Sequence, residues 1–196
     1  MVSANKAHRR SIRLPNYDYT QAGAYFVTII AHQRACLFGE IIRGEMHISS
    51  FGRIVIKEWE KLPSRFPMVG LDLMVLMPNH FHGIIMVLPE IDTAMNGNNT
   101  DLDLILKHRS SMGGNREEFG QPIPNSIPTV IRSFKAAVSL RINTIRGTQS
   151  GLVWQRNYYE RVIRDEMELL KIRKYIHENP LKWDLDNENP NFVPLH

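Results

Sequence analysis

Hydrophobic and polar positions along the chain follow two different periods, and the changes between them predict an order of strands and helices. A β-branched and aromatic run at residues 24–32 predicts a strand, and residues 36–49 predict a hairpin that continues it, with Arg43 and Gly44 at the turn. Apolar runs at residues 71–77 and 82–88 lack a helical period. We expect them to be neighbouring strands, or one bent strand pair, buried on both faces.

Three segments have helical spacing. The first begins at Ser49 or Ser50 and ends at Pro63. The second covers residues 126–147, with Pro128 in its first turn and Gly147 as its left-handed cap. Its apolar stripe is predicted to enter the core and consists of Val130, Ile131, Phe134, Val138 and Ile145. Its other face carries Arg132, Lys135, Ser139, Asn143 and Arg146.

The third helix covers residues 165–179. Asp165 and Glu168 have the spacing of a capping box, and Pro180 forces the helix to end. Its core stripe is predicted to be Leu169, Ile172 and Ile176.

The elements fit a single domain over residues 1–196. Within it we expect a basic N-terminal arm at residues 1–20, an insertion at 90–125 and a C-terminal tail at 183–196. The insertion is rich in Asn, Gly, Asp, Ser and Pro, a composition typical of a functional flap or a disordered segment.

Composition excludes several classes of protein. With 43% hydrophobic residues, the chain can build a packed core, so disordered and coiled-coil structures are ruled out. Its apolar runs are much shorter than the roughly 18 residues of a membrane span. The single cysteine, Cys36, cannot form an internal disulfide, and the sequence start lacks the apolar stretch of a secretory signal, so we expect a cytoplasmic protein.

Basic residues gather in two blocks. Residues 1–13 carry four Lys or Arg and no acid, and residues 126–182 carry eleven against five acids, whereas residues 14–125 carry nine against twelve. Two basic blocks around a mildly acidic middle indicate either a polyanionic partner such as nucleic acid or an ordinary solvated surface.

Two histidines, His80 and His82, flank Phe81 at the start of a predicted strand. Side chains alternate along a strand, so both imidazoles point to one side and can share a metal ion. The alternative is that each histidine is hydrogen-bonded for structural reasons.

A second candidate site lies on the last helix, where Lys171, Tyr175 and Asn179 follow at a spacing of four and line up. A phenol needs a nearby cation or base to act as a nucleophile, and Lys171 is placed to help. The alternative is a solvated helix face.

A third candidate is the aromatic and basic segment 154–164, which could stack on unpaired bases and bind phosphates or could simply pack beside the sheet. Its members are Trp154, Arg156, Tyr158, Tyr159, Arg161 and Arg164.

Together, the segments MPNHFHGIIMV, IRSFKAAVSLRI, VWQRNYYERVIRDE and KIRKYIHENPLKW resemble the single-tyrosine HUH transposases, named for a His-hydrophobic-His pair. The likeness runs from about residue 9 to residue 184, apart from the insertion, and is strongest to the REP-associated tyrosine transposases of repetitive extragenic palindromes. The resemblance implies an α+β, ferredoxin-like fold of the HUH endonuclease type, with an antiparallel sheet and helices packed on one face.

The resemblance also implies residue roles. His80 and His82 match the metal-binding pair, Tyr175 matches the nucleophile, and Asn179 matches the polar residue that completes the metal site. Insertion-sequence relatives usually have Gln where this chain has Asn179. The implied metal ion is Mg²⁺ or Mn²⁺.

The implied activity is cleavage and rejoining of single-stranded or hairpin DNA through a 5′-phosphotyrosine, by a monomer or a homodimer. Competing hypotheses are a regulator of the same fold that binds nucleic acid without catalysis, and a phosphodiesterase that activates water. Candidate phosphate contacts are Arg9, Arg10, Arg13, Arg132, Lys135 and Arg146.

Overall fold

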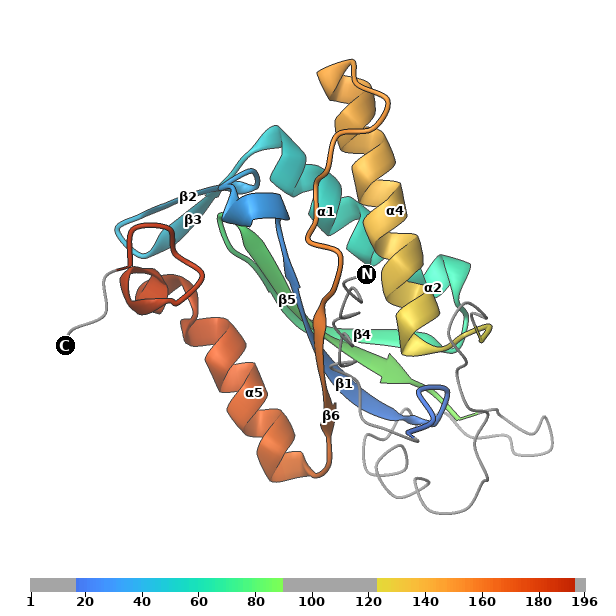
Figure 1. The fold of residues 1–196 in the computed structure, drawn as a ribbon. Coiled ribbons are helices and arrows are strands. Elements are labelled where there is room, and N and C mark those ends of the chain that lie inside the picture. Colours follow the sequence, from blue (N-terminus) through green and yellow to red (C-terminus); the bar gives the residue numbers. More distant parts are fainter. Residues whose placement is uncertain (1–16, 90–122, 193–196) are drawn as a thin grey trace, which may run out of the picture.

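The structure is a computed structural model and describes residues 17–89 and 123–192. Its centre is a four-stranded antiparallel sheet with the strand order β4-β5-β1-β6 (Figure 1). The strands are β1 (Gly23–Ile30), β4 (Val69–Leu76), β5 (His80–Val87) and β6 (Tyr159–Ile163). The main helices are α1 (Ser50–Glu60), α4 (Ile127–Arg146) and α5 (Glu166–Glu178).

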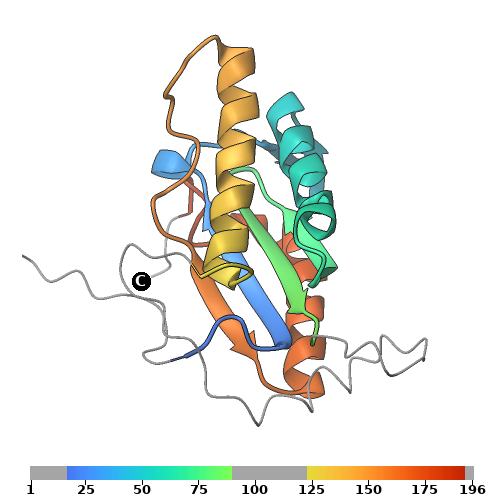
Figure 2. The same cartoon turned by 90° about the vertical axis from the view of Figure 1, so that its right-hand side faces the viewer.

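Helix α1 connects β1 to β4, and α4 connects β5 to β6, which together with the strand order makes the ferredoxin-like arrangement. The predicted α+β, ferredoxin-like fold with an antiparallel sheet is therefore confirmed. Figure 2 shows α1 and α4 side by side on one face of the sheet.

The expectation that every helix packs on one face needs a correction, because α5 covers the opposite face (Figure 1). Side chains of β1 alternate between the two sides: Tyr25 and Val27 join the core under α1 and α4, whereas Ala24 joins a second cluster with Leu169 and Ile172 of α5. The second cluster exists because both faces of the central strands are apolar.

The predicted hairpin forms, but it does not continue β1. Strands β2 (Gly39–Ile42) and β3 (Glu45–Ile48) make a separate two-stranded sheet. Arg43 and Gly44 both have positive φ, 53° and 80°, as a tight two-residue hairpin turn requires. A 3₁₀ helix, η1 (His32–Arg34), separates this hairpin from β1, so the chain leaves the main sheet before the turn.

The helix caps are confirmed. Ser49 accepts a hydrogen bond from the Gly52 amide at the start of α1, and Asp165 accepts one from the Glu168 amide at the start of α5. Helix α4 begins after Ser126 and ends at Gly147, with φ 64°. Pro63 does more than end α1, because it lies in the first turn of a short helix, α2 (Leu62–Arg65).

Two core predictions are wrong. Ile145 is 61% exposed, since the last turn of α4 extends past the strands, and Ile142 is buried instead. Strand β4 is not buried on both faces, because it lies at an edge of the sheet, and Leu73 is exposed there.

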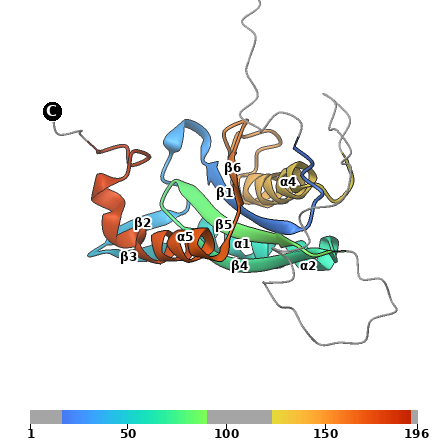
Figure 3. The ribbon, with the colours of Figure 1, turned by 90° about the horizontal axis from the view of Figure 1, so that it is seen from below.

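After α5, the described part of the C-terminal segment turns towards the β2–β3 hairpin. A 3₁₀ helix, η3 (Pro180–Leu185), follows α5 and lies beside the β2–β3 hairpin (Figure 3). The predicted arm with Arg9, Arg10 and Arg13, and most of the predicted insertion, lie outside the described residues. Within the described ranges, no helix combines the length and the apolar character that crossing a membrane requires.

Candidate active site

The two histidines lie on the face of the sheet that α5 covers. In the antiparallel register, His80 is opposite Ile30 and His82 is opposite Thr28 of β1. Phe81, between them, points to the other face, where its ring lies 4.6 Å from that of Trp59. The imidazole centroids are 4.7 Å apart, so the two rings share one side of β5, as the alternation predicts.

Helix α5 brings Tyr175 to the same place. Its hydroxyl oxygen, Oη, lies 3.2 Å from Nε2 of His82, and its ring packs edge-on against the ring of Phe26. The helix is held to the sheet by its apolar stripe and by an ion pair of 2.8 Å between Arg173 and Asp72 of β4. Tyr175 remains 42% exposed, so a substrate can reach it.

Asn179, the C-cap of α5, is 3% exposed. Its Oδ1 atom and the Nε2 atom of His80 are both buried and have no hydrogen-bond partner among the described residues. Buried polar atoms are normally paired, so each of these two acceptors is available to a further partner. An amide oxygen and an imidazole nitrogen are suitable ligands for a divalent cation.

The hydrogen bonds of Asn79 determine which nitrogen of His80 carries the proton. Asn79 Nδ2 donates to the carbonyl oxygens of Arg34, at 3.0 Å, and Glu188, at 2.6 Å. Its Oδ1 atom therefore faces His80 Nδ1 at 2.9 Å and must accept a hydrogen bond from it. In the neutral imidazole, Nε2 is then left with a free lone pair, the form that binds metals.

His82 has an equivalent partner in Thr28, whose Oγ1 lies 2.8 Å from Nδ1. When the hydroxyl accepts from Nδ1, Nε2 is free to accept the Tyr175 hydroxyl proton or to bind a metal ion. The tyrosine and a cation would therefore compete for the same nitrogen.

Burial keeps both imidazoles neutral. It lowers the pKa of His80 to about 4, although the negative charge of Glu188 opposes this shift. The pKa of His82 lies well below its usual value, mainly through burial and further through repulsion from His80. Neutral imidazoles are ready to act as ligands.

The pKa of Tyr175 is raised, first by burial and also by the carboxylates of Asp186 and Glu188, whereas a hydrogen bond from Asn179 opposes the shift. The hydroxyl therefore stays protonated in the metal-free site. Activating it as a nucleophile requires positive charge nearby.

The positive charge of Lys182 opposes the rise in the pKa of Tyr175. Lys182 is itself paired with Glu178 at 2.7 Å. Lys171, predicted to help the tyrosine, is exposed one turn earlier and is not among the groups that shift this pKa. Its assistance to Tyr175 stays a prediction.

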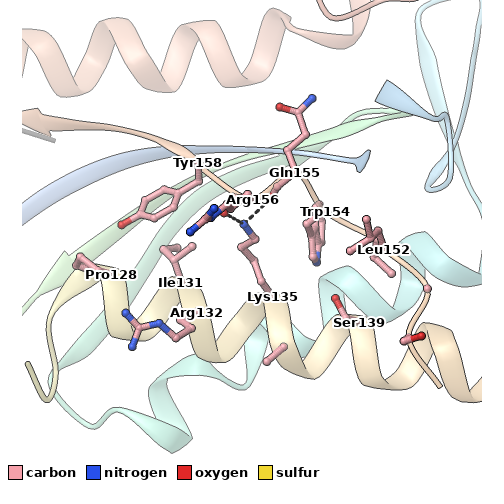
Figure 4. Close-up of a pocket in the computed structure, with 14 residues that line it drawn as sticks. Pro128, Ile131, Arg132, Lys135, Ser139, Leu152, Trp154, Gln155, Arg156 and Tyr158 are labelled. Atoms are coloured by element: carbon pink, nitrogen blue, oxygen red, sulfur yellow. Dashed lines mark hydrogen bonds between the residues drawn. The ribbon is translucent and has the colours of Figure 1, made fainter. Parts of the chain in front are cut away.

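Several predicted DNA contacts line a cavity of about 460 Å³ between α4 and the segment before β6 (Figure 4). Arg132 and Arg156 are exposed at this cavity. Lys135 instead reaches across it, and its ammonium donates to the carbonyl oxygens of Gln155, at 2.7 Å, and Arg156, at 3.0 Å. Burial lowers the pKa of Lys135 to about 8.

The aromatic residues of the same segment lie in three different environments. Trp154 is 6% exposed and packs on Phe38, so its ring belongs to the core. Tyr158 lines the cavity, whereas Tyr159 is 57% exposed and lies opposite Thr28, on the face that carries the histidines. Stacking by all three on one surface is therefore not available in this structure.

The remaining basic residues also differ in their surroundings. Arg146 lies over the Phe51 ring, 5.0 Å from its centre. Arg161 is paired with Glu168 at 2.6 Å, and Arg164 is exposed at the start of α5. Their DNA contacts stay predictions.

Sequence reasoning missed three residues of the site: Thr28, Asn79 and Asp186. Asn79 precedes the histidine pair directly, and an amide next to a metal-binding imidazole is a recognisable orienting partner. Thr28 depends on the strand register and Asp186 on the path of the chain after α5, neither of which a local pattern reveals.

The chain is similar to several known proteins. No protein-family model matches the chain. An uncharacterised Haemophilus influenzae protein is 38% identical and covers 91% of this chain and 92% of its own length. A second protein of that organism, provisionally described as a REP-associated tyrosine transposase, is 24% identical over 86% of this chain and 77% of its own length.

Among solved structures, a REP-associated tyrosine transposase bound to a REP hairpin matches with a TM-score of 0.52. It is 18% identical, and the match covers 91% of this chain and 74% of that one. The chain therefore belongs to the same family as the 38% identical Haemophilus influenzae protein, and it shares the fold of the solved REP-associated tyrosine transposase.

Proposed function

We propose that this protein is a transposase that cleaves and rejoins single-stranded hairpin DNA with Tyr175 as its nucleophile and Mg²⁺ or Mn²⁺ as its metal ion. The observation that carries the proposal is the convergence of Tyr175 Oη on His82 Nε2, 3.2 Å away, beside the bare acceptor atoms of His80 and Asn179. Two segments far apart in the sequence meet there, which supports a nucleophile placed next to a metal site.

His80, His82 and Asn179 would hold the metal ion. All three donors are neutral, and Asn79 and Thr28 orient the imidazoles. The chemistry that a divalent cation would supply there is polarisation of the scissile phosphate and stabilisation of negative charge on the leaving oxygen.

Tyr175 performs the covalent step. Its Oη forms a bond to phosphorus while the bond from phosphorus to the 3′ oxygen breaks. The tyrosine proton leaves to solvent, and the 3′ oxygen takes up a proton. The product is a 5′-phosphotyrosyl protein with a free 3′-OH, and attack by another 3′-OH reverses the step without an external energy source.

The similarity to a hairpin-bound protein and the charge of this chain support the proposed substrate class. The solved relative is bound to a REP hairpin, and this chain carries an excess of basic residues at 126–182. Arg132 and Arg156, exposed at the cavity beside α4, are available for phosphates. Tyr159, exposed beside Thr28, is available to stack on a base near the cut.

The test is incubation of the protein with a radiolabelled hairpin oligonucleotide carrying a single-stranded flank, in the presence of Mn²⁺. We expect a covalent protein–DNA adduct that resists denaturing gel electrophoresis and is lost in Tyr175→Phe. Tyr17→Phe is the matched control, because Tyr17 lies by Tyr25, away from the site, and should leave the adduct unchanged.

Other outcomes would identify a different activity. Cleavage without an adduct would show a phosphodiesterase that uses water. Tight binding without cleavage would show a DNA-binding protein of this fold. Either result overturns the proposed covalent mechanism.

A further inference from the structure

We propose that Asp186 is a further ligand of the metal ion, so that the donor set includes one carboxylate in addition to the two imidazoles and the amide. This inference rests on the proposed function. It concerns a residue on the segment after η3, which the resemblance to the HUH transposases does not assign.

The carboxylate of Asp186 points into the site. Its Oδ2 atom lies 3.7 Å from Nε2 of His80, and its side chain is 15% exposed. The other oxygen, Oδ1, accepts a hydrogen bond of 2.8 Å from the Glu188 amide, which fixes the orientation of the group. Oδ2 is therefore the free oxygen, and it faces the bare nitrogen.

The segment that carries Asp186 is anchored to the same elements as the histidines. Glu188 forms an ion pair of 2.6 Å with Arg34, and its carbonyl oxygen accepts from Asn79, the residue that orients His80. The Trp183 ring lies 6.1 Å from the His80 ring. The position of Asp186 is thus coupled to that of the imidazole.

A cation placed between these two atoms would bind to both of them. Because His80 Nδ1 donates to Asn79, Nε2 of the neutral ring presents a lone pair, and Oδ2 of an ionised carboxylate presents another. Two facing lone pairs repel, and burying a negative charge beside one is costly unless a cation joins them. A divalent cation with a preference for oxygen ligands satisfies both atoms.

The distance between His80 Nε2 and Asp186 Oδ2 is slightly longer than the distance between adjacent ligands of one metal ion. Neighbouring donors around Mg²⁺ lie about 3.0 Å apart when each is about 2.1 Å from the ion. As they stand, no three His, Cys, Asp or Glu side chains in the described ranges converge on one point, so the carboxylate must move inward by a fraction of an ångström to an ångström.

The test is Mn²⁺ binding to the full chain without DNA, measured by titration calorimetry and by electron paramagnetic resonance of free Mn²⁺. Asp186→Asn keeps an Oδ1 that can accept the Glu188 amide but removes the negative ligand. We expect its Mn²⁺ dissociation constant to rise at least tenfold. Water-proton relaxation should also show one additional exchangeable water on the bound ion.

The matched control is Asp184→Asn, which removes the same charge from an exposed residue of η3. It should bind Mn²⁺ as tightly as the wild-type protein, and Asp186→Glu should bind more tightly than Asp186→Asn. Equal affinity of Asp186→Asn and Asp184→Asn would overturn the ligand role while leaving the proposed function intact. If the wild-type protein itself bound no Mn²⁺, the metal-dependent function would fail with it.

Discussion

The metal-free protein should lose stability as pH falls from 6.5 towards 4, and His80 should account for a defined part of that loss. Burial lowers the pKa of His80 from 6.5 to about 4 in the folded state. Between these values the unfolded chain binds a proton that the folded protein does not, so acid favours unfolding. The contribution of His80 to stability is complete above pH 6.5 and is lost as pH falls through its folded pKa.

The magnitude follows from the two pKa values. Across the whole interval the free energy of unfolding should fall by about 3 kcal/mol, since one pKa unit corresponds to about 1.4 kcal/mol. Between pH 7 and pH 5.5 the expected loss is about 1.2 kcal/mol, a change of roughly eightfold in the folding equilibrium. This change is large enough to measure by denaturant unfolding.

The assay is urea unfolding followed by fluorescence of the three tryptophans, in chelator, at several pH values. Between pH 7 and pH 5.5, the free energy of unfolding of His80→Gln should fall by about 1.2 kcal/mol less than that of the wild-type protein. His47→Gln is the control, because His47 is exposed on β3, and it should follow the wild-type curve. Parallel curves for His80→Gln and the wild type would refute the reasoning, whatever their absolute stabilities.

Three further predictions concern the metal site, the DNA surface and the core. Thr28→Val removes the hydroxyl that orients the neighbouring imidazole and should weaken Mn²⁺ binding 10- to 100-fold in a calorimetric titration; unchanged affinity would contradict that role. Arg132→Gln should reduce the slope of log affinity against log salt by about 0.7 to 0.9 in fluorescence anisotropy with a hairpin oligonucleotide, and an unchanged slope would remove Arg132 from the interface. Gly83→Ala places a Cβ 2.6 Å from the Trp59 ring and should cost about 1–3 kcal/mol in urea unfolding, whereas Gly70→Ala, with contacts of 3.6 Å, should cost much less; equal losses would contradict the packing argument.

Much of the fold could be predicted because its determinants are local. Pro128 in the first turn of α4, the cap at Asp165, the left-handed Gly147 and the turn at Arg43 and Gly44 each depend on a few neighbouring residues, and each is confirmed. The errors occur where an element's position in the sheet decides burial. An apolar pattern cannot show that β4 lies at an edge, or that the last turn of α4 extends past the strands.

The sequence also does not predict which side of the sheet α5 covers. Its apolar stripe of Leu169, Ile172 and Ile176 predicts that one face is buried, but not against which face of the sheet. The ferredoxin-like expectation placed it beside the other helices. The structure shows that it covers the side with His80 and His82, which the alternation along β5 does not specify by itself.

The candidate site depends on this placement more than on any one motif. The histidine pair and the Tyr175–Asn179 spacing could be read from the sequence, since each lies within one element. Whether they meet depends on α5 crossing the sheet over the even-numbered residues of β5, so that Tyr175 Oη reaches His82 Nε2 at 3.2 Å. The orienting contacts of Thr28 and Asn79 come from elements far away in the chain, and they too require the folded register.

The same placement of α5 explains why a carboxylate oxygen and an imidazole nitrogen face each other in the site, where a metal ion could bind both. Covering the histidines with α5 and the segment after η3 buries the imidazoles, which keeps them neutral, and brings the Asp186 carboxylate towards His80 Nε2. It also raises the pKa of Tyr175, which weakens the tyrosine as a nucleophile in the metal-free state. Each of these effects is unfavourable without a positive charge and becomes useful with one. A cation held there would satisfy both the Asp186 carboxylate and the His80 nitrogen, and its charge would favour the ionised form of Tyr175.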